Sequence, residues 1–172
     1  MIDQDLMKAL IDGYTLPVLG THGLSHWARV LENGLRLAAS TGANERVVTL
    51  FAVFHDARRV NEAIDPGHGA RGGALATELR AQHLDLSDPE FALLVTACEH
   101  HTDGATDGDI TVQTCWDADR LDLWRVRTVP RREYLCTPAA CAPEILAWSR
   151  ERSESRFTPG YVLSEWLAGR DI

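Results

Sequence analysis

The stretch FAVFHDARRV, residues 51–60, joins an apolar segment directly to a His-Asp pair and two arginines. The run over residues 47–54 is apolar on nearly every side of a helix, which is typical of a helix at the centre of a bundle. A helix ordinarily ends in Gly or Asn, with its charged side chains turned toward water. Either the chain reaches the surface at His55 and Asp56, or the core delivers this pair to a site.

Apolar residues recur at helical spacing on both sides of this run. Asn44 is suited to cap the helix through residue 55, and Ser87 with Glu90 forms a capping box that opens a later helix. No alternating strand pattern and no repeat interrupts the sequence. We therefore expect an all-α, single-domain helical bundle spanning residues 1–172. The expected helices cover residues 2–11, 24–40, 45–55, 70–83, 88–101, 110–127, 144–153 and 162–167.

The composition excludes some classes of partner. The chain has 172 residues, of which 45% are hydrophobic and 24% charged, as in ordinary globular domains with one core. Its formal net charge is -8, which argues against a long nucleic acid because such a partner requires a basic surface. A small phosphorylated ligand remains compatible, since a few arginines in a cleft can bind it.

The four cysteines and the N-terminus point to a cytoplasmic protein. The cysteines form no C-x-x-C pair, and a chain of this length does not need disulfides, so we expect reduced thiols. The first residues, MIDQDLMKAL, carry acids where a signal peptide has basic residues. No apolar run approaches the ~20 residues of a membrane helix, so we expect no membrane partner.

The histidines carry the first functional signal, because all seven fall between positions 22 and 101. Imidazole and carboxylate groups together suit divalent metal ions. His101 continues the apolar stripe of the helix before it and is expected to point inward, whereas His100 lies one step around the helix. His26 adjoins the apolar stripe of its own helix. His22, one turn earlier, either lines the same cleft or caps that helix.

Two aspartates compete for a buried position on the expected helix 110–127. Asp119 shares a helical line with Val112, Cys115, Trp116, Leu123 and Val126. A carboxylate there is costly to bury unless it is paired or binds a metal. Asp117 lies on the other line, with Ile110, Leu121 and Trp124. Periodicity alone does not choose between Asp117 and Asp119.

The order of these elements resembles the HD-domain superfamily of metal-dependent phosphohydrolases. The matching elements are SHWARV (residues 25–30), the His55-Asp56 pair after an apolar helix, and DADRLD (residues 117–122). An HD dipeptide alone has little value as a motif, but these elements in this order are more specific. The resemblance covers about residues 20–127, the motif-bearing core. Residues 128–172 form a helical extension outside it, expected either to cover the cleft or to form a homodimer contact.

The resemblance implies a ligand set. It assigns one metal to His26, His55, Asp56 and Asp119, since the last Asp of the family precedes Arg-Leu. Some members hold a second metal through two further histidines, here His68 with His101 or His100, and Asp56 would then bridge the two ions. We therefore expect one or two divalent ions per chain, drawn from Mn, Mg, Fe, Co, Ni or Zn.

The resemblance also implies hydrolysis of a phosphate ester of a small molecule or nucleotide, by attack of metal-bound water. Asp56 would take part through the metal, and Arg58, Arg59 and Arg71 would neutralise phosphate oxygens. The alternative is a non-catalytic metal- or nucleotide-binding regulatory module of the same fold. A di-iron oxygenase is a third class of function.

Each of these residues also has an ordinary structural interpretation. His55 can favour a helix C-terminus, His26 can be a hydrogen-bonded core histidine, and His68 can belong to a Gly-rich loop. Arg58 and Arg59 can be solvated cations at a helix end. The metal hypothesis is favoured because the four elements occur together.

Overall fold

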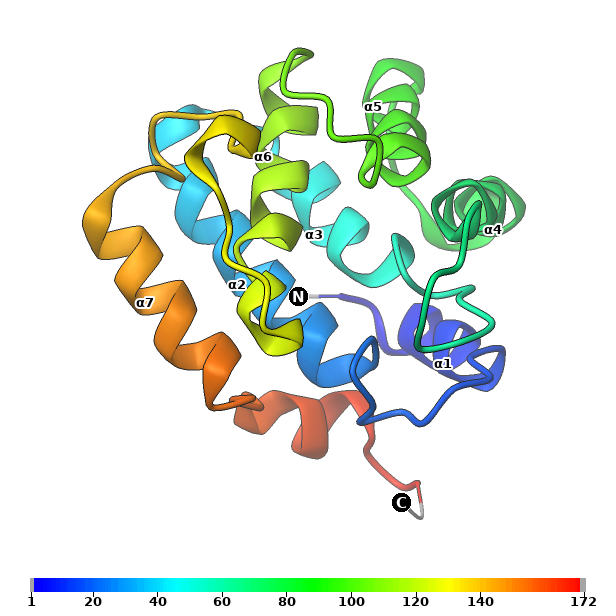
Figure 1. Ribbon diagram of the computed structural model, residues 1–172. Coiled ribbons are helices and arrows are strands. Elements are labelled where there is room, and N and C mark those ends of the chain that lie inside the picture. Colours follow the sequence, from blue (N-terminus) through cyan, green and yellow to red (C-terminus); the bar gives the residue numbers. More distant parts are fainter. Residues whose placement is uncertain (1, 171–172) are drawn as a thin grey trace.

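The computed structural model describes residues 2–170, and every regular element among them is helical, which confirms the all-α prediction (Figure 1). The longer helices are α1 (Gln4–Asp12), α2 (Leu24–Thr41), α3 (Glu45–Phe54), α4 (His68–His83), α5 (Asp88–His100), α6 (Ile110–Arg120) and α7 (Pro143–Glu154). Three short helices complete the fold, namely the 3-10 helices η1 (Leu123–Val126) and η2 (Arg132–Tyr134) and the π-helix η3 (Val162–Trp166).

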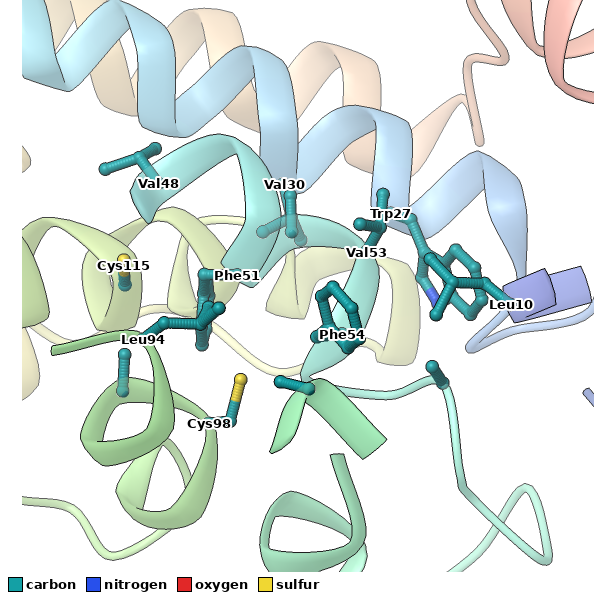
Figure 2. Close-up of a cluster of buried hydrophobic side chains, with 14 of the residues drawn as sticks. Leu10, Trp27, Val30, Val48, Phe51, Val53, Phe54, Leu94, Cys98 and Cys115 are labelled. Atoms are coloured by element: carbon teal, nitrogen blue, oxygen red, sulfur yellow. The ribbon is translucent and has the colours of Figure 1, made fainter. Parts of the chain in front are cut away.

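Helix α3 lies at the centre of the bundle and packs against α2, α4, α5 and α6 (Figure 1). The side chain of Asn44 caps its start by accepting hydrogen bonds from the N–H groups of Arg46 and Val47, as the sequence predicts. Phe51 and Phe54 are fully buried, and Figure 2 shows Phe51 between Val30 of α2 and Leu94 of α5. Burial of each such ring contributes about 1.5–3 kcal/mol to folding. Within residues 2–170, no helix combines the length and the apolar character that crossing a bilayer requires.

Two glycines bring α4 close to the ends of α3 and α5. A Cβ atom on Gly72 would lie 2.5 Å from the carbonyl oxygen of Phe54, and one on Gly69 would lie 2.2 Å from that of Cys98. No larger residue fits either position without a shift of the backbone. The first turn of α4 is thereby held against the last turns of α3 and α5.

The boundaries of α5 follow the predicted signals. Ser87 and Glu90 form the capping box, and a proline occupies the first turn. The buried side chains of the helix include Leu94 and Cys98 on the predicted stripe. His101 follows the last helical residue and is buried, whereas His100 is exposed.

The helix expected over residues 110–127 is shorter than predicted. α6 ends at Arg120, and η1 follows after a turn at Leu121 and Asp122. Because the helical period breaks there, Val126 does not continue the helical line of Asp119, and its side chain is 39% exposed.

The C-terminal extension packs against the outside of the bundle. α7 lies along α2 and η1, and η3 contacts α1 and α2 (Figure 1). Leu135 and Ala140 share a small buried cluster with Leu37 of α2 and Leu121 at the end of α6. The extension is therefore attached to the helices that carry the candidate site.

Candidate metal centre

Five helix ends deliver six ionisable side chains to one buried place. His26 lies in the first turn of α2, the His55-Asp56 pair ends α3, and His68 begins α4. His101 follows α5, and Asp119 lies in the last turn of α6. The side chains other than that of Asp119 are almost wholly buried, and that of Asp119 is 14% exposed.

The first cluster contains His26, His55, Asp56 and Asp119. The Nε2 atoms of His26 and His55 are 3.1 Å apart. Asp56 Oδ2 lies 3.5 Å from His26 Nε2 and 3.8 Å from His55 Nε2. Asp119 Oδ1 lies 3.4 Å and 3.8 Å from the same two nitrogens. Two ligands each ~2.1 Å from a metal are separated by about 3.0–3.4 Å at right-angled or tetrahedral geometry, so these spacings suit a shared ion.

The second cluster contains His68, His101 and the other oxygen of Asp56. The Nε2 atoms of His68 and His101 are 2.9 Å apart. Asp56 Oδ1 lies 3.2 Å from His68 Nε2 and 3.9 Å from His101 Nε2. His26, His55 and Asp56 form one group able to hold a metal ion, and Asp56, His68 and His101 form another. Asp56 therefore presents one oxygen to each group.

Hydrogen bonds at Nδ1 fix the orientation of three of these histidines through backbone carbonyls. His55 Nδ1 lies 3.1 Å from the carbonyl oxygen of Ala52, His68 Nδ1 lies 2.6 Å from that of Asp65, and His101 Nδ1 lies 2.7 Å from that of Cys98. A carbonyl oxygen only accepts hydrogen bonds, so each Nδ1 carries the proton. In each of the three rings, Nε2 is then the nitrogen that faces the centre.

Asp122 fixes His26 in the same way and was not predicted from the sequence. Its Oδ2 accepts a hydrogen bond from His26 Nδ1 at 2.8 Å. Arg29 donates to both Asp122 oxygens, from Nε at 2.7 Å and from Nη2 at 2.9 Å. Arg29 lies one turn after His26, so its place in the SHWARV motif was the available signal.

Burial and mutual charge set the protonation of the centre. Burial lowers the pKa of His55 to about 3 and also lowers that of His101, so both rings are neutral at pH 7. Burial alone would raise the pKa of Asp56, but the imidazoles of His55, His26 and His68 outweigh it and hold that pKa well below its usual value. A carboxylate buried among imidazoles in a dry site is costly unless it is paired or binds a cation, so this arrangement can hold a metal ion.

The structure distinguishes the members of two pairs of candidate ligands, the aspartates at positions 117 and 119 and the histidines at positions 100 and 101. Asp117 points away from the centre and accepts hydrogen bonds from the backbone N–H groups of Cys136 and Thr137. His100 is exposed and pairs with Asp103 at 2.7 Å. Asp119 and His101 are the members of each pair that reach the centre.

One of the three predicted arginines reaches the centre. Arg59 is buried, with its Nη1 3.5 Å from Asp56 Oδ1 and 3.2 Å from His68 Nε2. Arg58 instead donates hydrogen bonds to the carbonyl oxygens of Leu10 in α1 and of Ala57.

Arg71 is held in a different set of contacts. Its Nη2 lies 2.6 Å and 2.7 Å from the two carboxylate oxygens of Asp65, and its Nε donates to the carbonyl oxygen of Arg58. The structure therefore places Arg71 against the loop before α4, and the side chain of Arg58 against the carbonyl oxygen of Leu10 in α1. Their predicted contact with a phosphate stays a prediction.

His22 lies beside the centre without joining either group. Its ring centroid is 6.2 Å from that of His26, and its Nδ1 lies 2.6 Å from Glu62 Oε2. Burial lowers the pKa of His22. Glu62 was not among the predicted site residues, because a single acid in a polar loop has no periodic signal.

Chemically, the arrangement offers nitrogen and oxygen ligands to one or two divalent ions, and such donor sets suit Mn, Fe, Co, Ni or Zn. The chain's own hydrogen bonds fix the direction of each imidazole, as they do around metal sites in general. Comparison with known proteins finds no family model, no curated protein and no solved structure that matches this chain.

Proposed function

We propose that this protein is a metal-dependent phosphohydrolase of the HD-domain type that cleaves a phosphate ester of a small molecule or nucleotide. The observation that carries the proposal is the pair of histidine groups that share Asp56, each oxygen of which faces a different group. The order of these residues along the chain is the order in the HD-domain resemblance. Hydrolytic centres for phosphate esters commonly use two divalent ions about 3.5–4 Å apart.

The residues of the chain prepare the site for this reaction. His26, His55, His68 and His101 are oriented by their Nδ1 hydrogen bonds before any ligand arrives, so little reorganisation is required. Asp119 is the most exposed carboxylate of the centre, and it marks the side from which a substrate enters. A divalent ion held here supplies an acidified water, with a pKa lowered from ~15.7 toward ~7, and polarises a phosphoryl oxygen.

The overall reaction adds water across the ester. The water oxygen bonds to phosphorus, the bond from phosphorus to the ester oxygen breaks, and that oxygen takes up a proton. The products are the free alcohol and inorganic phosphate. The guanidinium of Arg59 lies 3.5 Å from Asp56 Oδ1, which offsets negative charge in the buried centre.

The neighbouring histidines at positions 100 and 101 provide a matched test of the function. Hydrolysis of a panel of phosphate esters by the Mn²⁺-loaded protein is measured for wild type, His101→Ala and His100→Ala. We expect His101→Ala to lower kcat/KM by about 100-fold or more, because a ligand is lost. His100→Ala should stay within about twofold of wild type, because its ring is exposed and bonded to Asp103.

Two results would contradict the proposal. One is the failure of metal-loaded wild type to hydrolyse any ester of the panel, and the other is wild-type activity in His101→Ala. Melting curves of both variants separate loss of the site from loss of the fold.

A non-catalytic metal-binding regulatory module is the second candidate. It is favoured by the deep burial of the centre, where His26 and His55 have no exposed surface. Tight metal binding together with no turnover of any phosphate ester would support this candidate over the enzyme.

A further inference from the structure

The segment over residues 127–137, here called the tail loop, is fixed beside the metal centre by Asp117 and Arg120, the first and last residues of the DADR motif that contains Asp119. Asp117 accepts hydrogen bonds from Cys136 N at 2.7 Å and from Thr137 N at 2.8 Å. Arg120 donates from Nη1 to the carbonyl oxygen of Tyr134 at 2.6 Å. The residues on either side of Asp119 therefore hold the tail loop next to this candidate ligand.

A pocket of about 350 Å³ lies between the tail loop and the ends of α5 and α6. Asp119 and His101 line one part of it, so the pocket borders the metal centre at these two residues. Pockets of roughly 300–1,000 Å³ hold small molecules in proteins generally. Much of the remaining lining is apolar and comes from Leu123, Val129, Pro130, Tyr134 and Leu135.

The polar groups of the pocket are poorly suited to a sugar or a polyphosphate. The guanidinium of Arg120 is engaged by the carbonyl oxygens of Tyr134 and Ala105. Arg131 stands exposed and pairs with Glu133 at 3.2 Å. Outside the metal centre, the other polar side-chain groups of the lining are the hydroxyls of Thr102, Thr128 and Tyr134, so a hydroxyl-rich group would find few partners for the hydrogen bonds that it loses to water. An apolar group makes no hydrogen bonds to water and therefore loses none when it enters the pocket.

We propose that this pocket binds the apolar, ring-bearing part of the substrate, which makes the substrate a phosphate monoester of an aromatic or similarly apolar alcohol. The proposal rests on the function proposed above, because the phosphate is taken to lie at the metal centre. Tyr134 and Pro130 supply flat apolar surfaces against which a ring packs. Asp119 and His101 mark the end of the pocket where the phosphate would lie.

Binding of two non-hydrolysable phosphonates tests the proposal without relying on turnover. Calorimetry measures the Kd of phenylphosphonate and of methylphosphonate for the Mn²⁺-loaded full chain. We expect phenylphosphonate to bind about 10- to 100-fold more tightly, since burial of the ring supplies the difference.

Two valines provide a matched test of whether the preference for phenylphosphonate arises in this pocket. Val129 lines the pocket and is 56% exposed, whereas Val126 is 39% exposed and lies outside the pocket lining. Val129→Asp places a charge in the pocket and should reduce the preference for the phenyl compound to less than about threefold. Val126→Asp places the same charge nearby and should leave the preference unchanged.

The outcomes separate this proposal from the proposed function. A phenyl preference that is lost in Val129→Asp supports the pocket even if no ester is hydrolysed, and in that case only the proposed function fails. Equal binding of the two phosphonates, no binding of either, or a preference that Val129→Asp leaves intact would overturn the pocket proposal. Hydrolysis of esters alongside any of those results would leave the proposed function standing.

Discussion

At the scale of single residues, the candidate metal centre depends on side chains that do not themselves point toward the place of the metal. Asp122 joins His26 to Arg29, so the ring of His26 is fixed by a carboxylate that is itself fixed by a buried guanidinium. The contacts from His26 and Arg29 outweigh the effect of burial and lower the pKa of Asp122, which keeps it an acceptor. The proton of His26 therefore stays on Nδ1, and Nε2 is left as a ligand atom.

Asp122→Asn tests this role. An asparagine amide has one acceptor oxygen in place of two. It therefore cannot accept all the hydrogen bonds that Asp122 accepts from His26 and Arg29, and the ring of His26 is less firmly oriented. We expect the affinity for Mn²⁺ to fall by about 10- to 100-fold, as measured by calorimetry. Asp103→Asn is the control, because Asp103 is an exposed aspartate paired with His100 away from the centre. Unchanged affinity in Asp122→Asn, with the fold intact by circular dichroism, would contradict the role.

The sequence could predict some of these residues and not others. Periodicity could not separate Asp117 from Asp119, because both lie within α6 and both side chains are largely buried. The resemblance favoured Asp119, which the structure places at the centre. Asp122 lies in the turn between α6 and η1, where a helical pattern carries no information.

At the scale of elements, the centre requires α4 to start against the ends of α3 and α5. Helix α4 carries weak helix formers at Gly69, Gly72 and Gly73, each of which costs about 1 kcal/mol relative to Ala in an isolated helix. At Gly69 and Gly72 the close approach of a neighbouring carbonyl explains the choice. Close packing of α4 places His68 within 2.9 Å of His101.

Neighbouring glycines allow a controlled test of this packing. Gly72→Ala would place a Cβ 2.5 Å from a backbone carbonyl, whereas Gly73→Ala would meet the flexible side chain of Glu99 at 3.2 Å. We expect Gly72→Ala to lower the free energy of unfolding by about 1–3 kcal/mol and to weaken metal binding. Gly73→Ala should be neutral or stabilise by up to about 1 kcal/mol, because alanine favours the helix. Urea denaturation measures both, and equal effects would contradict the packing argument.

The existence of most helices could be predicted from local signals. Asn44 before α3, and Ser87 with Glu90 before α5, act through contacts within three residues and are visible in the sequence. The fixing of the tail loop depends on Asp117 and Thr137, whose hydrogen bond spans twenty positions of the chain. No local pattern reports such a contact.

At the scale of the whole molecule, the bundle brings the ends of five helices to one point and surrounds them with a core. α3 is apolar enough to occupy the middle of the bundle, and His55 and Asp56 directly follow its last turn and are buried there. Burial lowers the pKa of His55, and hydrogen bonds with His26 and His68 help to lower the pKa of Asp56 against the effect of its burial. In FAVFHDARRV, the apolar run therefore forms the central helix, and the His-Asp pair after it supplies two side chains of the candidate centre.

The most direct test of the account is the metal content of the chain. Elemental analysis is applied to wild type and Asp56→Asn, both purified without chelator or histidine tag. Because each oxygen of Asp56 faces its own pair of histidines, we predict two equivalents of divalent metal per wild-type chain and loss of both in the variant, with helix content retained. A wild-type chain without metal, or an Asp56→Asn chain that retains two equivalents, would contradict the account.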